Sequence, residues 1–496
     1  MQVRTQPEQI DSYVSDTSNM PGGHAERVFV PSSVEEIQEI MREASGSETP
    51  VTISGARTGT VGGAVPFGGY VVSLEKLNNI KSIDKDGSTI VVEPGVLLGD
   101  VQKAADGEGL FYPPDPTEWS CQIGGTVATN ASGARSFKYG ATRDYVERLK
   151  VVLASGELLE LSRGKYQSDS NGKIGLGGVS INAPSYVRPD VRKNASGYYS
   201  AEPLDAIDLF IGSEGTLGVV VEVELRLLKK PEGLFSGIVF FEKRGDLLAF
   251  VDAVRRRSSS RGARNQDAIA PGSHLSATLV EYFDPNSLRF ISERFPDSPT
   301  DVAGAIFFEQ ETTTANEDTL FAGWNDLLEK HNADLERSWF TTNDQDRIKM
   351  REFRHALPLA ANERYSRSGM KKVSTDMAVP VENFNSFLKF YEDTLTASAL
   401  EFIIFGHIGD CHLHLNIFPK DETEAHRARQ IYGRCVAQAL MVGGTISAEH
   451  GIGKLKRKYL EVMMGERYLN EMAAIKRALD PKGILGRGNM FDEKYL

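Results

Sequence analysis

Hydrophobic residues in the first half of the chain gather in short runs rich in β-branched side chains. These runs lie at 51–54, 69–74, 88–93, 149–154 and 217–227, and glycine-rich turns separate them. Such runs favour strands. A further strand-like piece starts at Val28 and leads into a helix start at Ser32–Glu36, and another helix is expected at 98–108. The pattern predicts an α+β fold with much β-structure.

The same pattern predicts four parts. The polar first residues (1–26) are expected to form a loosely held arm, and residues 27–232 a first domain. Within it, 163–202 is rich in Ser, Gly and Asn and has little periodicity, which indicates a long loop or insertion. After the turn at Lys229, a second α+β domain spans 233–420. A helical C-terminal segment, 421–496, has candidate helices at 426–442 and 465–479.

Composition excludes several classes of protein. A chain of 496 residues is too long for one ordinary core. No apolar run approaches the length of a bilayer span, and the N-terminus lacks the apolar core of a signal peptide, so we expect a cytoplasmic protein. The net charge of −12 disfavours nucleic-acid binding. The three cysteines form no Cys-x-x-Cys pair, so the chain alone cannot ligate an iron–sulfur cluster.

The most informative stretch is 405–418, which holds three of the nine histidines. If it forms a strand, His412, His414 and Asn416 share one face. His407 precedes a Gly-Asp turn, so its ring can fold toward that face. Glu449 and His450 follow some distance later. Such an inventory is typical of a divalent metal site with an open position, or of an acid–base site; the alternative is a set of scattered structural histidines. Cys411 is either a further ligand or a small neighbour.

Three glycine-rich loops lie at 54–66, 113–133 and 211–220. Closely spaced glycines let the backbone approach a ligand and direct N–H groups at an anion. None of the loops is a P-loop or the GxGxxG dinucleotide fingerprint. Each alone is as consistent with tight turns as with a phosphate cradle. Three in one domain favour a large phosphate-bearing cofactor.

These loops, in this order, resemble the FAD-binding domain of the p-cresol methylhydroxylase/vanillyl alcohol oxidase flavoprotein superfamily. The particular likeness is to its D-2-hydroxy-acid dehydrogenase branch, which includes D-lactate dehydrogenase (cytochrome type), D-2-hydroxyglutarate dehydrogenase and the glycolate oxidase D subunit. The segments that carry it are 123–133, 138–146, 212–218, 406–410, 448–453 and 479–485. The resemblance implies a two-subdomain FAD-binding domain at 27–232, an α+β cap or substrate domain at 233–420, and a C-terminal segment that returns to the FAD site.

The resemblance also assigns the cofactor contacts. They are Ser54, Gly55, Ala56, Arg57, Thr58, Gly59, Thr60, Gly63, Pro116, Gly124, Gly125, Thr126, Asn130, Ser132, Gly133, Tyr139, Glu214, Gly218, Val219 and Asn489. Members that bind FAD covalently use a His or a Cys. Here the first loop has Arg57 and no His, and Cys121 is not at the covalent position, so non-covalent FAD is expected.

By the same resemblance, His407, His414 and Glu449 are the ligands of a divalent metal, Zn or Mn, and His450 is the general base. Arg354 corresponds to the substrate arginine, with Arg351 one helical turn away as the fallback; the alternative for either is a surface charge. Where relatives usually read Gly-Asp-Gly-Asn-Leu-His, this chain has His412, which is another ligand, a substrate contact or a partner of a ligand. Asn416 is expected to contact the substrate, and Asn194 and Tyr198 to line the site.

Some relatives that take a dicarboxylate carry a Lys two residues before an Asp. Here the Asp is Asp376 and Ser374 stands at the Lys position, which argues against a second substrate carboxylate. The implied activity is the oxidation of a D-2-hydroxy acid, lactate-like or glycolate-like, by hydride transfer to flavin N5. Electrons would pass to an external cytochrome, quinone, electron-transfer flavoprotein or iron–sulfur subunit, which allows a peripheral place at a membrane. A homodimer is expected. The alternatives are a transferase like alkyl-dihydroxyacetone-phosphate synthase and a flavin-binding subunit of a larger oxidase.

Overall fold

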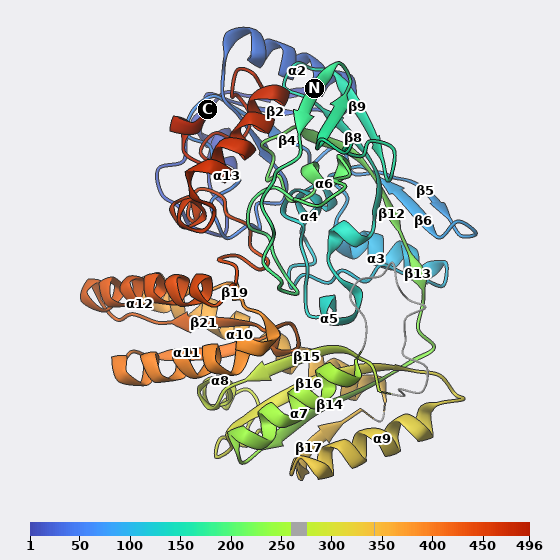
Figure 1. Ribbon diagram of the computed structural model, residues 1–496, viewed down its shortest axis with the longest axis vertical. Helices are drawn as coiled ribbons and strands as arrows, with labels where there is room; N and C mark the ends of the chain where they lie inside the picture. Colours follow the sequence, from blue (N-terminus) through green and yellow to red (C-terminus); the bar gives the residue numbers. More distant parts are fainter. Residues whose placement is uncertain (259–274, 342) are drawn as a thin grey trace.

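The computed structural model describes residues 1–258, 275–341 and 343–496. The N-terminal half builds two sheets in the upper part of Figure 1. One has the order β1-β2-β4-β3, and the other the order β5-β6-β12-β8-β9. Their strands are β1 Gln2–Arg4, β2 Arg27–Val30, β3 Val51–Ser54, β4 Tyr70–Ser73, β5 Ile80–Asp84, β6 Thr89–Val92, β8 Val146–Val152, β9 Leu158–Ser162 and β12 Val219–Arg226. Two smaller pairs join β7 (Leu110–Phe111) to β13 (Leu228–Lys229) and β10 (Lys173–Leu176) to β11 (Val179–Asn182).

Short helices connect these strands. They are α1 Pro7–Ile10, α2 Val34–Ser47, α3 Leu98–Gly107, α4 Ile123–Thr129, α5 Ser136–Tyr139 and α6 Ile207–Phe210. The predicted start of α2 is confirmed, because the Ser33 side chain accepts a hydrogen bond from the backbone N–H of Glu36. Between β9 and α6 the chain is irregular apart from the β10–β11 hairpin, as the composition of 163–202 predicted.

The expectation of a loosely held N-terminal arm is wrong. Strand β1 pairs antiparallel with β2, so that Val3 lies opposite Phe29. Ile10 and Tyr13 are buried against the outer side of β2 and β4. The segment is polar overall, but these few apolar side chains suffice to bind it to the sheet edge.

The second half centres on a large antiparallel sheet, in the lower part of Figure 1. Its order is β17-β14-β16-β15-β20-β21-β18, and β19 also pairs with β21. The strands are β14 Gly233–Phe241, β15 Ala277–Phe283, β16 Gly304–Thr312, β17 Asp334–Phe340, β18 Val373–Ser374, β19 Met377–Ala378, β20 Phe402–Gly406 and β21 His412–Ile417. The helices are α7 Arg244–Arg257, α8 Pro285–Ile291, α9 Glu317–Lys330, α10 Asp344–Ser368, α11 Phe384–Ser398 and α12 Glu422–Met441.

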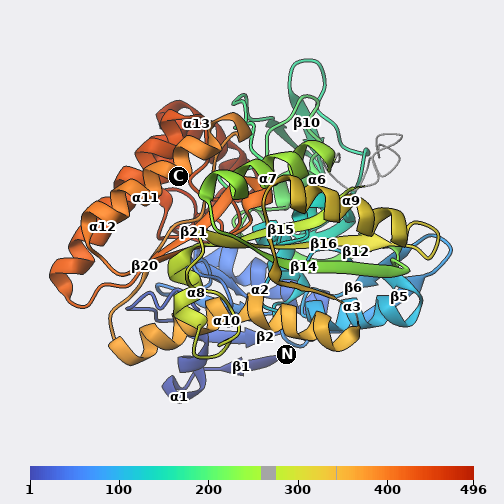
Figure 2. The same cartoon turned by 90° about the horizontal axis from the view of Figure 1, so that it is seen from below.

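Helices cover both faces of this sheet, with α7 and α9 on one side and α8 and α10 on the other (Figure 2). Strand β14 shows why. Val239 and Phe241 belong to the core that contains residues of α7 and α9, whereas Ile238 and Phe240 belong to the core beneath α8 and α10. The period of two along a strand therefore supplies an apolar surface to each layer.

The last helix, α13 (Arg457–Leu479), lies beside the N-terminal half rather than beside the large sheet (Figure 1). The chain that follows it runs next to β3, where Val51 exchanges backbone hydrogen bonds with Ile484 and Gly486. Helix α12 still packs against α11 and the edge of the large sheet, so the chain returns to the N-terminal half only after α12. Within the described ranges, no helix is long and apolar enough to cross a membrane.

Candidate active site

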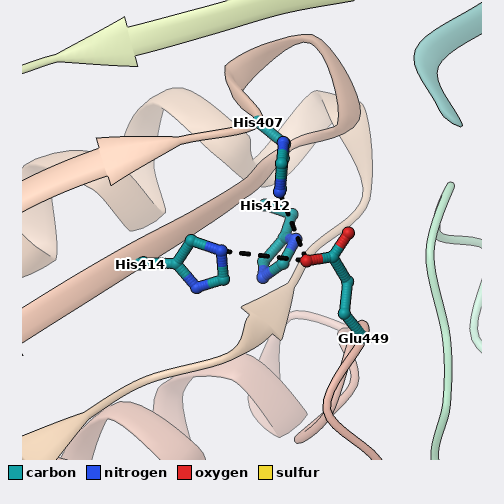
Figure 3. A group of neighbouring side chains, drawn as sticks. All are labelled: His407, His412, His414 and Glu449. Carbon is teal, nitrogen blue, oxygen red and sulfur yellow. Dashed lines mark ion pairs between the residues drawn. The ribbon is translucent and has the colours of Figure 1, made fainter. Parts of the chain in front are cut away.

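The polar face of β21 forms the centre of the site. Along this strand Leu413, Leu415 and Ile417 enter the hydrophobic core, so His412, His414 and Asn416 face the other way. His407 directly follows β20, and the turn at this point places its ring over the same face. The ring centroid of His412 lies 5.2 Å from that of His407 and 4.6 Å from that of His414 (Figure 3). The predicted convergence of the three imidazoles is confirmed.

Glu449 completes this cluster from a segment of the chain after α12. Its Oε2 lies 3.2 Å from Nε2 of His407 and 3.8 Å from Nε2 of His414 (Figure 3). One donor atom from each of His407, His412, His414 and Glu449 lies within 4.8 Å of the others. Three imidazoles and a carboxylate suit a divalent ion such as Zn²⁺ or Mn²⁺.

Glu281, on β15, orients His407 and was not found from the sequence. Its Oε1 lies 2.6 Å from Nδ1 of His407, which leaves Nε2 directed at Glu449. Burial disfavours the protonated ring, but the carboxylates of Glu281 and Glu449 raise the pKa of His407 to about 9. An ion that binds here therefore displaces a proton from His407.

A buried lysine, Lys193, holds the other oxygen of Glu449. Its Nζ donates a hydrogen bond to Glu449 Oε1 at 2.6 Å, and Ser132 Oγ donates to the same oxygen at 2.7 Å. Lys193 also lies 3.3 Å from the buried carboxylate of Asp410. It comes from the irregular segment 163–202, where no periodic pattern marks it.

His450 lies beside His414, with the two rings nearly parallel and their centroids 5.4 Å apart. Its Nδ1 is 3.4 Å from Oδ2 of Asp376, and its backbone N–H donates to the same oxygen. Burial and the nearby Lys456 lower the pKa of His450, against the raising effect of Asp376. A neutral imidazole held in this way can accept a proton.

Two cavities meet at these histidines. One, of about 820 Å³, is lined by Arg354 and Asn416; the other, of about 370 Å³, is lined by the three glycine loops. His407, His414 and His450 line both. Nε of Arg354 lies 3.2 Å from Glu281, and Asn416 Oδ1 has no hydrogen-bond partner among the described residues.

The smaller cavity gathers most of the predicted cofactor contacts. Those that line it are Gly55, Ala56, Arg57, Thr58, Gly59, Thr60, Gly63, Pro116, Gly124, Gly125, Thr126, Ser132, Gly133, Glu214 and Gly218. Glu214 also accepts hydrogen bonds from the backbone N–H groups of Ile452 and Gly453. It thereby ties the third loop to the segment that carries Glu449 and His450.

Five predicted contacts lie behind the cavity wall instead. Ser54 is buried at the end of β3, Tyr139 packs on Phe111, and Val219 faces the core. Asn130 ends α4 in a left-handed conformation, and its Oδ1 accepts the N–H of Arg143. Asn489 donates from Nδ2 to the carbonyls of Gly63 and Glu214, so it joins two loops rather than lining the space between them.

The shape of the smaller cavity fits an extended cofactor. A Cβ added at Gly59 or Gly125 would meet no described protein atom within 4 Å, so both positions face open space that a ligand can fill. Gln122 Oε1 is buried at the same wall and lacks a hydrogen-bond partner among the described residues. Cys121 lines the cavity as well, but burial raises the pKa of its thiol to about 12, which disfavours the thiolate needed for a covalent link.

Other predicted site residues lie elsewhere. Arg351 is exposed and outside both cavities. Tyr198 is buried and bonds to Thr216, and Asn194 bonds to Thr445 instead of facing the histidines. His412 lines neither cavity because the chain covers it completely, so it is not placed to contact a substrate. Cys411 is buried at the turn before β21 and is not among the clustered donor atoms.

Comparison with known proteins agrees with this architecture. Residues 25–162 match the family described as "FAD binding domain", and residues 269–490 match "FAD linked oxidases, C-terminal domain". The chain is 31% identical to D-lactate dehydrogenase of Anaerostipes hadrus, over 92% of this chain and 88% of the relative. It is 31% identical to glycolate oxidase subunit GlcD of Bacillus subtilis, over 94% and 88%, and 30% identical to D-2-hydroxyglutarate dehydrogenase of Stutzerimonas stutzeri, over 99% and 96%.

Solved structures show the same fold at lower identity. The 4-ethylphenol oxidase from Gulosibacter chungangensis superposes with a TM-score of 0.70 at 17% identity, over 100% of this chain and 95% of the other. An alkyldihydroxyacetonephosphate synthase gives a TM-score of 0.66 at 14% identity, over 98% and 82%. The expected α+β fold, with an FAD-binding domain of the p-cresol methylhydroxylase type, is confirmed. The chain belongs to the FAD-linked oxidase family and is an FAD-dependent oxidoreductase, similar over nearly its whole length to D-lactate dehydrogenase, glycolate oxidase subunit GlcD and D-2-hydroxyglutarate dehydrogenase.

Proposed function

We propose that the protein oxidises a D-2-hydroxy acid, lactate-like or glycolate-like, to the 2-oxo acid. Non-covalent FAD occupies the cavity of the glycine loops, and His407, His414 and Glu449 hold a divalent ion, Zn or Mn. The observation that carries this proposal is the position of His407, His414 and His450, which line both cavities at once. A substrate held in the larger cavity beside Arg354 then meets the cofactor cavity at these histidines.

The chain supplies three groups to such a substrate. The Arg354 guanidinium binds the carboxylate, and its contact with Glu281 fixes its direction. The unpaired Oδ1 of Asn416 is available to accept the hydrogen bond of the substrate hydroxyl. His450 takes the proton of that hydroxyl, while Asp376 holds the imidazole in place.

When bound, the ion would lower the pKa of the substrate hydroxyl and FAD would supply the acceptor for the hydride of the Cα–H. The electrons then leave to an external acceptor, which is a cytochrome, a quinone, an electron-transfer flavoprotein or a separate iron–sulfur subunit. The three cysteines of this chain are far apart in the sequence, and the thiols of all three are buried, which supports an acceptor outside the chain.

The names of the relatives support the substrate class, because they include a D-lactate dehydrogenase, a glycolate oxidase subunit and a D-2-hydroxyglutarate dehydrogenase. Ser374 lines the larger cavity and faces Asn416 across β18 and β21, which favours a substrate with one carboxylate. Lys372 also lines this cavity, so D-2-hydroxyglutarate belongs in the panel of substrates tested.

A transferase on the same fold is the second candidate, since the fold of an alkyldihydroxyacetonephosphate synthase is similar. In such an enzyme no net oxidation occurs. A flavin-binding subunit without activity of its own is the third. The complete set of His407, His414, Glu449 and His450 argues against that reading, because a subunit without catalysis has no need to bring them together.

An anaerobic absorbance titration tests the proposal. The purified flavoprotein is mixed with the D- and L-forms of lactate and 2-hydroxyglutarate and with glycolate, before and after treatment with a chelator. We expect one D-acid or glycolate to bleach the visible band of oxidised flavin, chelation to abolish the bleaching, and Zn²⁺ or Mn²⁺ to restore it. If flavin is bound and no acid bleaches it, the dehydrogenase proposal is wrong. If bleaching persists after complete metal removal, the metal requirement is wrong.

A further inference from the structure

His412 is a buried imidazole without a hydrogen-bond partner. It begins β21, none of its surface is exposed, and neither ring nitrogen makes a hydrogen bond to any described residue. Leaving a buried polar group unpaired destabilises the folded state. A position of this kind indicates that the ring nitrogen serves a ligand that the protein chain does not itself provide.

The neighbours of His412 are the three residues of the candidate metal site. Its donor atom lies within 4.8 Å of those of His407, His414 and Glu449. Two nitrogens bound to one Zn²⁺ at about 2.1 Å each can be at most about 4.2 Å apart. Four donors arranged tetrahedrally at that distance are about 3.4 Å apart. The four donor atoms therefore have to draw together by at most about 1.4 Å to bind one ion.

Each imidazole of the cluster has a polar group beside it that can hold the ring. Glu281 lies 2.6 Å from Nδ1 of His407, and the carbonyl of Thr375 lies 3.5 Å from Nδ1 of His414. Asp376 Oδ1 lies 3.1 Å from Nε2 of His412, close enough for a charge interaction although the two atoms are not aligned for a hydrogen bond. Metal-binding histidines typically have such a carboxylate or carbonyl behind the ring.

Two other roles for His412 fit less well. A substrate contact is excluded by burial, because the side chain lines neither cavity. A purely structural role, in which His412 stabilises the charge of Asp376, is not needed, because other groups already do so. That carboxylate accepts hydrogen bonds from the Lys456 ammonium, the Ser447 hydroxyl and the backbone N–H of His450.

We propose that His412 is the fourth protein ligand of the ion, so that three imidazoles and one carboxylate hold it. This inference rests on the proposed function, and it adds one ligand to the metal site named there. A nitrogen-rich set favours Zn²⁺ over Mn²⁺ and over the oxygen-preferring Mg²⁺ and Ca²⁺.

The test counts imidazoles on the ion directly. The full-length flavoprotein is stripped with a chelator, reloaded with one equivalent of Zn²⁺ and studied by X-ray absorption at the zinc edge. Zn²⁺ affinity is measured separately by competition with a chromophoric chelator. The variant is His412→Asn, which retains a polar side chain. The matched control is His426→Asn, the same change at an exposed position on α12.

We expect three imidazoles per zinc in the parent and in His426→Asn, two in His412→Asn, and a loss of Zn²⁺ affinity of at least about tenfold in His412→Asn alone. Two imidazoles in the parent, or an unchanged count and affinity in His412→Asn, would overturn the proposal, and so would a parent that binds no Zn²⁺. The parent count stands even if the variant fails to fold, which far-UV circular dichroism and flavin content will show. These measurements do not depend on turnover. A hydroxy acid can therefore fail to bleach the flavin although three imidazoles bind the zinc, and bleaching can occur although only two imidazoles bind it.

Discussion

The Nζ atom of Lys193 lies 2.6 Å from Oε1 of Glu449 and joins a segment without regular structure to the centre of the site. Lys193 is buried and Glu449 is largely buried, and Lys193 also neutralises the buried Asp410 at 3.3 Å. Removing the ammonium of such a buried cluster leaves the two carboxylates without a compensating charge, which destabilises the folded state. The segment 163–202 is therefore part of the structure that holds the candidate site together, although its sequence resembles that of an ordinary loop.

Replacing this lysine should destabilise the protein strongly. In Lys193→Met, Glu449 and Asp410 lose their common cation, and we expect the free energy of unfolding to fall by about 3–5 kcal/mol in chelator-treated protein. Added Zn²⁺ should recover part of the loss, because an ion on Glu449 replaces the missing charge. Denaturant unfolding with and without Zn²⁺ measures both effects. Lys389→Met removes an exposed lysine paired with Asp393 on α11 and serves as the control, for which little change is expected. Equal losses in the two variants would contradict the assigned role of Lys193.

Glu281 should control the affinity for the metal without touching it. The change Glu281→Gln removes the charge behind His407 but keeps the size of the side chain, and we expect Zn²⁺ affinity to fall about 10- to 100-fold. Chelator competition gives the value. Glu392→Gln, at a carboxylate on α11 that pairs with Arg244 and lines neither cavity, should leave the affinity unchanged. An unaltered affinity in Glu281→Gln would mean that His407 needs no carboxylate to bind the ion.

Arg354 should determine substrate binding. Arg354→Lys keeps a positive charge but loses the planar fork, so we expect KM for the best 2-hydroxy acid to rise at least about tenfold, with flavin content unchanged. Steady-state kinetics with an artificial electron acceptor measure this. Arg351→Lys makes the same change three residues away at an exposed position, and its KM should match the parent. A KM that rises in Arg351→Lys and not in Arg354→Lys would reverse the assignment.

The two helical glycines Gly125 and Gly46 allow a matched test of the cofactor cavity. An added Cβ meets no described protein atom at either position, but Gly125 lines the smaller cavity and Gly46 is on the exposed face of α2. Gly125→Val should therefore lower the flavin content at least about tenfold by filling the cradle, without reducing the stability of the flavin-free protein, and Gly46→Val should retain flavin. The ratio of flavin to protein absorbance after purification decides the matter. Full flavin occupancy in Gly125→Val would place the cofactor elsewhere.

Much of the site follows from local pattern. The period of two in 412–417 predicts which side chains share a face of β21, and the glycine spacing predicts where the backbone leaves room for a ligand. Each of these two signals is local, because it is contained in a single short segment of the chain. The structure adds little to them except the distances.

The residues that the sequence did not reveal come from elements far apart in the chain. Glu281 meets His407 because β15 pairs with β20, more than a hundred residues later, and no local pattern encodes that pairing. Lys193 likewise reaches the cluster through long-range packing, and so does Asp376, which the sequence marked only as the Asp of a motif and not as a partner of His450. His412 was identified as unusual from its sequence, but its complete burial, which excludes a substrate contact, depends on the packing of β19 against β21.

Asp284 should make stability depend on pH at a site away from the metal cluster. It precedes α8, and its side chain accepts the N–H of Ser287 at 2.7 Å. Burial raises its pKa from 3.8 to about 6, partly opposed by the hydrogen bonds from Ser287. The folded state therefore binds more protons than the unfolded state between about pH 4 and pH 6. As the pH rises through this window the parent loses stability, by up to about 3 kcal/mol, and the loss is complete above the folded pKa.

The variant Asp284→Asn keeps a good helix cap but cannot ionise, so it should lack this dependence. We expect its stability relative to the parent to increase as the pH rises from about 4 to about 6 and then to level off above the folded pKa. Denaturant unfolding at a series of pH values measures the difference. Asp421→Asn makes the same change at the exposed cap of α12, whose side chain accepts the N–H of Glu424, and serves as the control. The prediction is contradicted if the free energies of unfolding of the parent and Asp284→Asn differ by the same amount at every pH. In that case the ionised Asp284 is not destabilised by burial, and Ser287 and the helix end stabilise its charge.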